Sequence, residues 1–150
     1  MRKTSAYTRK RCRQADPSAI YRVIGRLQPF TSDELAKLGT PVRAAFERMR
    51  NGVAETYDFD TLAGAMNICL VRGESIDQLC VETAKRAQDA LMRAFYRNKI
   101  TGKWGFDGPA LQDIPIGIDL YEQMLALSTP MQMQSVMKTT IERMNKGNTL

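Results

Sequence analysis

Hydrophobic positions recur at intervals of three and four residues along most of the chain, the period of an α-helix with one buried face. The pattern is clearest over residues 74–99. It also predicts helices over residues 17–28, 58–71, from about Asp113, and over 130–146. The chain has no convincing strand pattern. The sequence therefore predicts an all-α fold, a compact bundle of five or six helices.

The apolar stripes of four of these helices identify the side chains that we expect in the core. They are Met66, Leu79, Leu91, Phe95, Tyr121, Leu125, Met137 and Ile141. The linker of residues 72–74 is short, so the helices on either side of it should pack as an antiparallel hairpin. Asp58 and Asp113 are the expected caps of two helices, and Gly147 should end the last one.

Residues 31–52 begin with Thr31 and Glu34 at the spacing of a capping box. Gly39 and Pro41 then predict an interruption between two helices. This arrangement resembles a helix-turn-helix, whose contacts with DNA would come from Arg43, Arg48 and Arg50. The alternative, two capped amphipathic helices joined by a glycine turn, is favoured because the spacing from Ala36 to Gly39 is one residue too short.

The N-terminal helix predicted over residues 17–28 begins with Asp16 as cap and Pro17 in the first turn. Its apolar face consists of Ile20, Val23, Ile24 and Leu27. Pro29 ends it. We therefore divide the chain into residues 1–15, an arm, and residues 16–150, a single helical domain.

Charge is concentrated in the arm. The net charge of the chain is +6, and the arm holds six cations and no acid, namely Arg2, Lys3, Arg9, Lys10, Arg11 and Arg13. The remaining 16 Lys and Arg balance 16 Asp and Glu, so the domain itself is neutral. A basic tail on a neutral domain indicates binding to a polyanion, either nucleic acid or an acidic protein surface. The alternative is a solvated tail without a partner.

Missing residue types exclude several kinds of chemistry. The chain has no histidine, and its three cysteines are widely spaced. These facts remove histidine general bases, Ser-His and Cys-His nucleophiles, and four-ligand zinc sites. Glycine-rich phosphate loops are absent as well. Asp58 and Asp60 could bind a cation, but Asp58 is better interpreted as a helix cap. We expect no enzyme activity, no cofactor and no metal.

The longest nearly apolar run covers residues 63–71, which is too short to span a membrane. An odd number of scattered cysteines is not a disulfide framework, so a reduced cytoplasm is the expected compartment.

Two features could provide protein contacts. Trp104 and Phe106 lie in a glycine-bearing loop, where aromatic side chains serve as interface anchors or, more commonly, pack against the end of a bundle. Four of the nine methionines lie in the last helix, whose stripe is Met133, Met137, Ile141 and Met144. Methionine stripes are usually core, but they also occur at adaptable interfaces, including those of homo-oligomers.

The segment DFDTLAGAMNICLVRG, residues 58–73, followed by a long helix and a C-terminal helix, resembles small helical accessory proteins of proteobacterial phages and mobile elements. That resemblance implies that the protein is an accessory protein of a mobile genetic element, and it implies no particular activity. The first functional hypothesis is a binding protein that docks on a large protein or nucleoprotein partner, for example an inhibitor of a host defence complex of the anti-CRISPR type. The alternative is a DNA-binding regulator that uses residues 31–52 and the arm.

Overall fold

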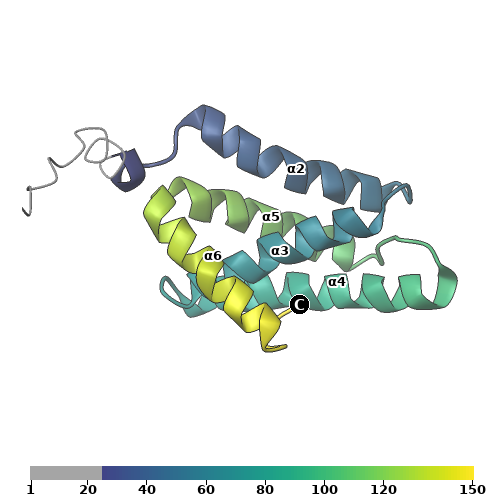
Figure 1. Cartoon of the computed structure of the whole chain (residues 1–150). Helices are drawn as coiled ribbons and strands as arrows, with labels where there is room; N and C mark the ends of the chain where they lie inside the picture. The colour runs from purple at the N-terminus through teal and green to yellow at the C-terminus, as the bar shows by residue number, and fades with distance from the viewer. Residues whose placement is uncertain (1–24) are drawn as a thin grey trace, which may run out of the picture.

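The structure, a computed structural model, describes residues 25–150 (Figure 1). Its helices are α2 (Ser32–Arg50), α3 (Thr56–Gly73), α4 (Gln78–Thr101), α5 (Ala110–Ala126) and α6 (Pro130–Asn145), with no strand in the described range. The prediction of an all-α bundle is confirmed. Two predicted features lie outside the described residues: residues 17–24 of the N-terminal helix, and the basic arm with Arg2, Lys3, Arg9, Lys10, Arg11 and Arg13.

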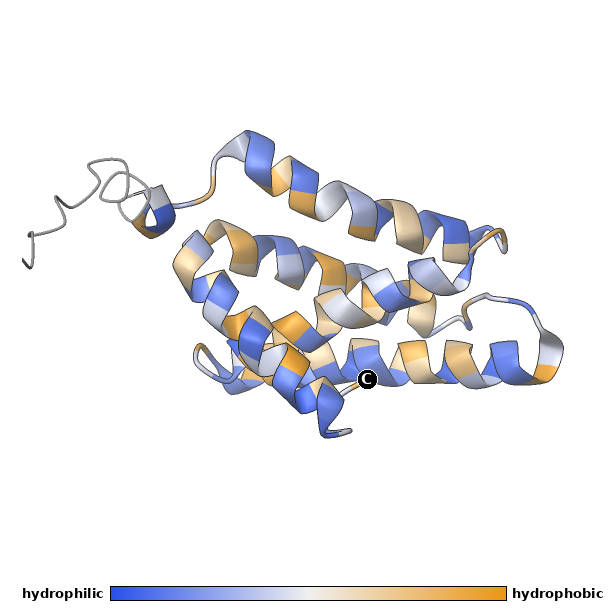
Figure 2. Ribbon diagram, viewed as in Figure 1, coloured by the Kyte–Doolittle hydropathy of each residue, from blue (hydrophilic) through white to orange (hydrophobic). Residues whose placement is uncertain are grey.

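Helix α3 is the centre of the bundle and contacts each of the other four helices named above. It is followed by a short loop of residues 74–77 and by α4, which packs antiparallel to it as expected for a hairpin. Since neighbours surround it, α3 buries apolar residues on several sides, among them Leu62, Met66 and Leu70. In Figure 2 the hydrophobic positions gather between the helices, while hydrophilic positions cover the outside.

Three helices meet at Gly117 of α5. A Cβ atom at this position would lie 2.6 Å from Met66 Sδ of α3 and 2.8 Å from Ala87 Cβ of α4. Helix α4 allows this approach with small side chains along its buried face, namely Ala84, Ala87, Ala90 and Ala94. The crossing of α3, α4 and α5 therefore depends on the absence of side-chain volume at one residue.

A polar contact passes through the core beside this crossing. The Gln88 amide donates to Asn67 Oδ1 at 2.7 Å, and Asn67 Nδ2 donates to the carbonyl oxygen of Leu150 at 2.7 Å. Asn67 is fully buried. The amide group of Asn67 is thus satisfied by one partner on α4 and one at residue 150, as burial of a polar group requires.

The interruption predicted at Gly39 and Pro41 is wrong, because α2 is one continuous helix through both residues. Pro41 removes one backbone donor and strains the preceding turn. Tertiary packing outweighs this cost: Val42, Phe46 and Met49 are buried on the same face, and Gly39 lies against the side chain of Glu122. Residues 31–52 consequently lack the turn that a helix-turn-helix needs.

Two predicted caps are also corrected. The N-cap of helix α3 is Glu55, three residues before the expected Asp58, and Asp58 accepts a hydrogen bond from the Glu55 backbone N–H at 2.9 Å from inside the first turn. Helix α5 likewise begins before Asp113, with Asp107 accepting from the Ala110 N–H at 2.8 Å. The capping boxes at Thr31 and Thr129 are present, and Gly147 follows the last helix with a φ of 70°.

The predicted core is correct for Met66, Leu91, Tyr121 and Leu125, which are all buried, and Phe95 is half-buried against the core. The prediction that Leu79 is buried is wrong. Its side chain is 62% exposed, because Val81 and Ala84 occupy the inward side of the first turns of α4.

The predicted burial of Met137 and Ile141 is also wrong, because their side chains are 49% and 55% exposed. Helix α6 contacts α3 but has no extensive contact with α2 or α5, so part of its apolar face lacks a neighbouring helix.

We predict that Gly117→Ala destabilises the protein by about 1–3 kcal/mol, because its methyl group must displace Ala87 and the buried Met66. Gly64→Ala is the matched control. Gly64 is also within a helix, but nothing lies within 4 Å of an added Cβ, so alanine should stabilise by about 0.5–1 kcal/mol. Urea unfolding of the two variants measures both effects. Equal stability of Gly117→Ala and wild type would mean that the three helices do not pack this closely.

Candidate functional site

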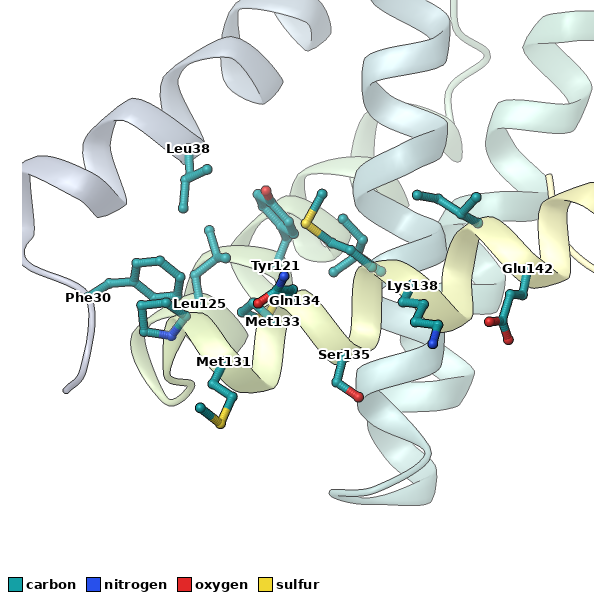
Figure 3. A pocket seen from close by; sticks show the side chains of 14 residues that line it. Phe30, Leu38, Tyr121, Leu125, Met131, Met133, Gln134, Ser135, Lys138 and Glu142 are labelled. Atoms are coloured by element: carbon teal, nitrogen blue, oxygen red, sulfur yellow. The ribbon is translucent and has the colours of Figure 1, made fainter. Parts of the chain in front are cut away.

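An apolar groove of about 930 Å³ lies between α6 and the facing parts of α2 and α5. We call it the methionine groove. Its apolar lining comes mainly from Phe30, Leu38, Tyr121, Leu125, Met131, Met133, Met137 and Ile141. Figure 3 shows Phe30, Leu38 and Leu125 around one end of the groove, with Lys138 and Glu142 farther along α6.

The groove exists because α6 crosses α3 instead of lying along α2 (Figure 1). A turn of residues 127–129 separates α5 from α6, and the Thr129 capping box fixes where α6 begins. Ser128, which is buried in this turn, accepts a hydrogen bond from Arg72 Nε of α3 at 3.0 Å. The start of α6 is thereby tied to the end of α3, and the space beside it stays open.

The lining of the groove suits an apolar ligand. Tyr121 and Leu125 form a floor that is 6% and 2% exposed, while Met137 and Ile141 stand half-exposed at its side. The polar lining residues are Gln134, Ser135, Lys138 and Glu142, all on α6. Methionine side chains are flexible and polarisable, so such a surface adapts to the shape of what it binds.

Tyr121 places one hydroxyl group at the groove. Burial raises the pKa of Tyr121 to about 12, so the phenol stays protonated at neutral pH. Its hydroxyl group makes no hydrogen bond to another side chain or backbone group of residues 25–150. It can therefore give a ligand one directional contact in otherwise apolar surroundings.

The arginines of the predicted helix-turn-helix are held in ion pairs. Arg43 of α2 donates to both carboxylate oxygens of Glu122 at 2.6 Å and to Asp119 Oδ1 at 2.9 Å, which joins α2 to α5.

Arg48 donates from Nε to Asp58 Oδ1 at 2.8 Å, which joins α2 to α3, and Arg50 pairs with Glu47 at 2.9 Å. The structure therefore brings these three cations to acidic side chains of the same molecule, and the carboxylate of Asp58 is engaged by Arg48.

Trp104 and Phe106 pack against aromatic rings of α3 and α2. The Trp104 ring stacks on Phe59 of α3 with ring centroids 5.0 Å apart, and Phe106 stacks on Phe46 of α2 at 5.4 Å. Both are half-buried against the core. These contacts agree with the packing interpretation of the loop, and the two rings lie at the end of the bundle where α2 ends and α3 begins. A role of Trp104 and Phe106 as interface anchors stays a prediction.

The other reactive groups of residues 25–150 form no second site. Cys69 is buried, which raises the pKa of its thiol, and both Cys69 and Cys80 are free. Residues 25–150 contain no cluster of three or more His, Cys, Asp or Glu that could hold a metal ion. Within the same range, none of the helices has the length and apolar character needed to cross a bilayer.

Comparison with protein-family models, with curated proteins and with solved structures gave no match to this chain.

The groove itself was missed by sequence reasoning. One signal was present: the apolar stripe of the last helix is rich in methionine, which is common at adaptable surfaces. Phe30 and Leu38 gave no signal, because their place beside α6 depends on the tertiary fold.

We predict that the Arg48–Asp58 pair contributes to acid sensitivity. The hydrogen bond from Arg48 holds the pKa of Asp58 below its ordinary value. A carboxyl group with a lowered pKa stabilises the fold above its unfolded-state pKa of about 3.9, and this stabilisation is lost as pH falls through the folded-state pKa. Wild type should therefore lose stability more steeply below about pH 4 than Asp58→Asn.

The matched control is Asp60→Asn, which removes an exposed carboxylate that has no ion pair with residues 25–150. Its urea midpoint should follow the wild-type curve from pH 7 to acid. If Asp58→Asn also ran parallel to wild type, the pair would not contribute to the pH dependence.

Proposed function

We propose that this protein is a non-enzymatic binding protein whose methionine groove receives an amphipathic helix of a larger protein or nucleoprotein partner. The observation that carries the proposal is the groove itself, a long apolar depression with half-exposed methionine and isoleucine side chains. Apolar concave surfaces with a few polar groups are where proteins commonly bind ligands and partner segments.

The shape of the groove favours a helix as ligand. Its α6 wall runs from Met131 to Glu142, which corresponds to about 16 Å or three helical turns. A helix of this length presents apolar anchors at positions i, i+3 or i+4, and i+7 to one groove. Lys138 and Glu142 at its edge offer charges of both signs to the polar flank of such a helix.

The basic arm adds a second contact to the proposal. Its six cations suit an acidic surface or nucleic acid on the same partner. Together with the resemblance to accessory proteins of mobile elements, this combination fits an inhibitor that occupies a surface of a host defence complex.

A DNA-binding regulator is the second candidate, and the composition of the arm is the observation that favours it. The ion pairing of Arg43, Arg48 and Arg50 weakens its other support.

We predict that Met137→Glu together with Ile141→Glu weakens partner binding by about 100-fold or more, because two apolar anchor positions become charged. The control is Tyr96→Glu with Ile100→Glu on α4, at the same spacing, with the same change in charge and with 60% and 85% exposure. Proteins captured from the source organism by wild type and by the control, but not by the groove variant, are then purified. Calorimetry with the purified partner measures the difference. Equal affinity of the groove variant and wild type would contradict the proposal.

A second prediction concerns the arm. If all six cations contact phosphates of duplex DNA, log affinity should fall with log salt at a slope of about −5, or about a thousandfold between 50 and 200 mM. Replacing the six by Gln keeps the chain length and should flatten this slope without changing the thermal unfolding midpoint. A protein partner held mainly by the groove should instead lose association rate and keep most of its affinity. An unchanged slope and affinity for duplex, single strand and protein partner would mean a solvated tail.

A further inference from the structure

Helix α4 lies along one edge of the bundle, where it packs against α3 and α5 (Figure 1). Its outer side concentrates positive charge. Although the domain as a whole is neutral, residues 85–103 hold six of its 16 cations and only one of its 16 acids, Asp89. All six cations are exposed, namely Lys85, Arg86, Arg93, Arg97, Lys99 and Lys103. A neutral domain therefore presents one basic helix face.

Most of these cations are not neutralised by an acid of the same molecule. Arg93 pairs with Asp107, with 2.7 Å between Nε and Oδ2. The other five form no ion pair within residues 25–150. In this they differ from the three arginines of α2, which are paired with carboxylates. The charge of the α4 face is thus left for an anion that residues 25–150 do not supply.

Aromatic and apolar side chains stand among these cations. Spacings of three and four residues place on one face of the helix Tyr96, Lys99, Ile100 and Lys103. The Tyr96 side chain is 60% exposed and that of Ile100 is 85% exposed. The ring of Phe95 contacts Tyr96 edge-on, with centroids 5.8 Å apart, and its own centroid lies 5.0 Å from Lys99 Nζ. An exposed ring among cations is the combination that stacks on bases and binds phosphates.

We propose that the outer face of α4 between residues 93 and 103 binds single-stranded nucleic acid. Tyr96 stacks on a base, and the neighbouring phosphates are bound by Arg97, Lys99 and Lys103. A single strand is favoured over a duplex, because its bases are free to stack on a protein ring. An acidic protein surface would use the cations but leave the ring of Tyr96 without a stacking partner. The methionine groove is lined by other helices, so this proposal does not rest on the proposed function.

The phosphate contacts are tested by fluorescence anisotropy of the full-length chain over a range of salt concentrations. The probes are labelled oligothymidine and oligouridine of about 12 nucleotides. Replacing Arg97, Lys99 and Lys103 by Gln should flatten the slope of log affinity against log salt by about 2, if each contacts one phosphate. A flatter slope with oligothymidine, with oligouridine or with both identifies DNA, RNA or either as the ligand.

The matched control replaces Arg26, Lys138 and Lys146 by Gln. These residues are also exposed and form no ion pair within residues 25–150. The control removes the same charge and should keep the wild-type slope, since the cations of the arm are intact in both variants. Equal slopes of the two triple variants would overturn the proposal. A polyglutamate peptide that binds as tightly as either oligonucleotide, and loses as much affinity in the α4 variant, would identify an acidic protein surface instead.

Stacking is tested with Tyr96→Ala, which keeps every charge. Affinity for the single strand should fall by about five- to hundredfold, with an unchanged salt slope. The control is Tyr57→Ala. Tyr57 is 70% exposed on α3, about 200° around that helix from Phe59, whose ring contacts Phe95 of α4. It should bind as wild type does.

Thermal unfolding midpoints identify any variant that fails to fold, and the stacking and phosphate variants decide independently. Equal affinities of Tyr96→Ala and Tyr57→Ala would mean that no base stacks on Tyr96. An equal loss of affinity for a duplex of the same length would mean that the contact is not with an unpaired base. Either result contradicts single-strand binding by this face.

Discussion

The close approach of three helices at Gly117 is the constraint on which the rest of the molecule depends. With Met66 and Ala87 at the positions where a side chain of residue 117 would begin, α5 can lie in only one place on the α3–α4 hairpin. Helix α2 is then attached to α5 and α3 through Arg43 and Arg48. Ion pairs at partly exposed positions contribute little to stability. They do fix which way α2 lies across a surface that packing at Gly117 has already defined.

The two ends of the bundle differ as a result. At one end, the loop of residues 102–109 folds Trp104 and Phe106 onto α3 and α2, so that aromatic rings fill the space between the helices. At the other end, α6 turns across α3, and the apolar sides of α2, α5 and α6 face a gap that no described segment fills. Aromatic packing thus fills one end of the bundle, whereas at the other end apolar side chains of three helices line an open groove.

The helices could be predicted from the sequence because the period of their apolar residues reports local structure, and buried residues such as Met66, Leu91 and Leu125 lie on the expected stripes. The misassignments have tertiary causes. Gly39 and Pro41 carry the signals of a turn, but the packing of α2 against α5 holds the helix through them. Met137 and Ile141 carry the signal of a core face, yet burial also requires a neighbouring helix, which periodicity cannot reveal. The groove was invisible for the same reason, since its walls are residues far apart in sequence.

The contact between Asn67 and Leu150 affects how the chain reaches this structure during synthesis. The α3–α4 hairpin can form early, because its residues are neighbours in sequence and leave the ribosome together. The amide of Asn67, however, must lose its water when the hairpin is covered, and its acceptor is the carbonyl group of a residue 83 positions later. Until residue 150 has been made, the Nδ2 group of Asn67 at the centre of the bundle lacks this hydrogen-bond acceptor. The hydrogen bonding at the centre of the bundle is therefore completed by a residue that is made after all the helices around it.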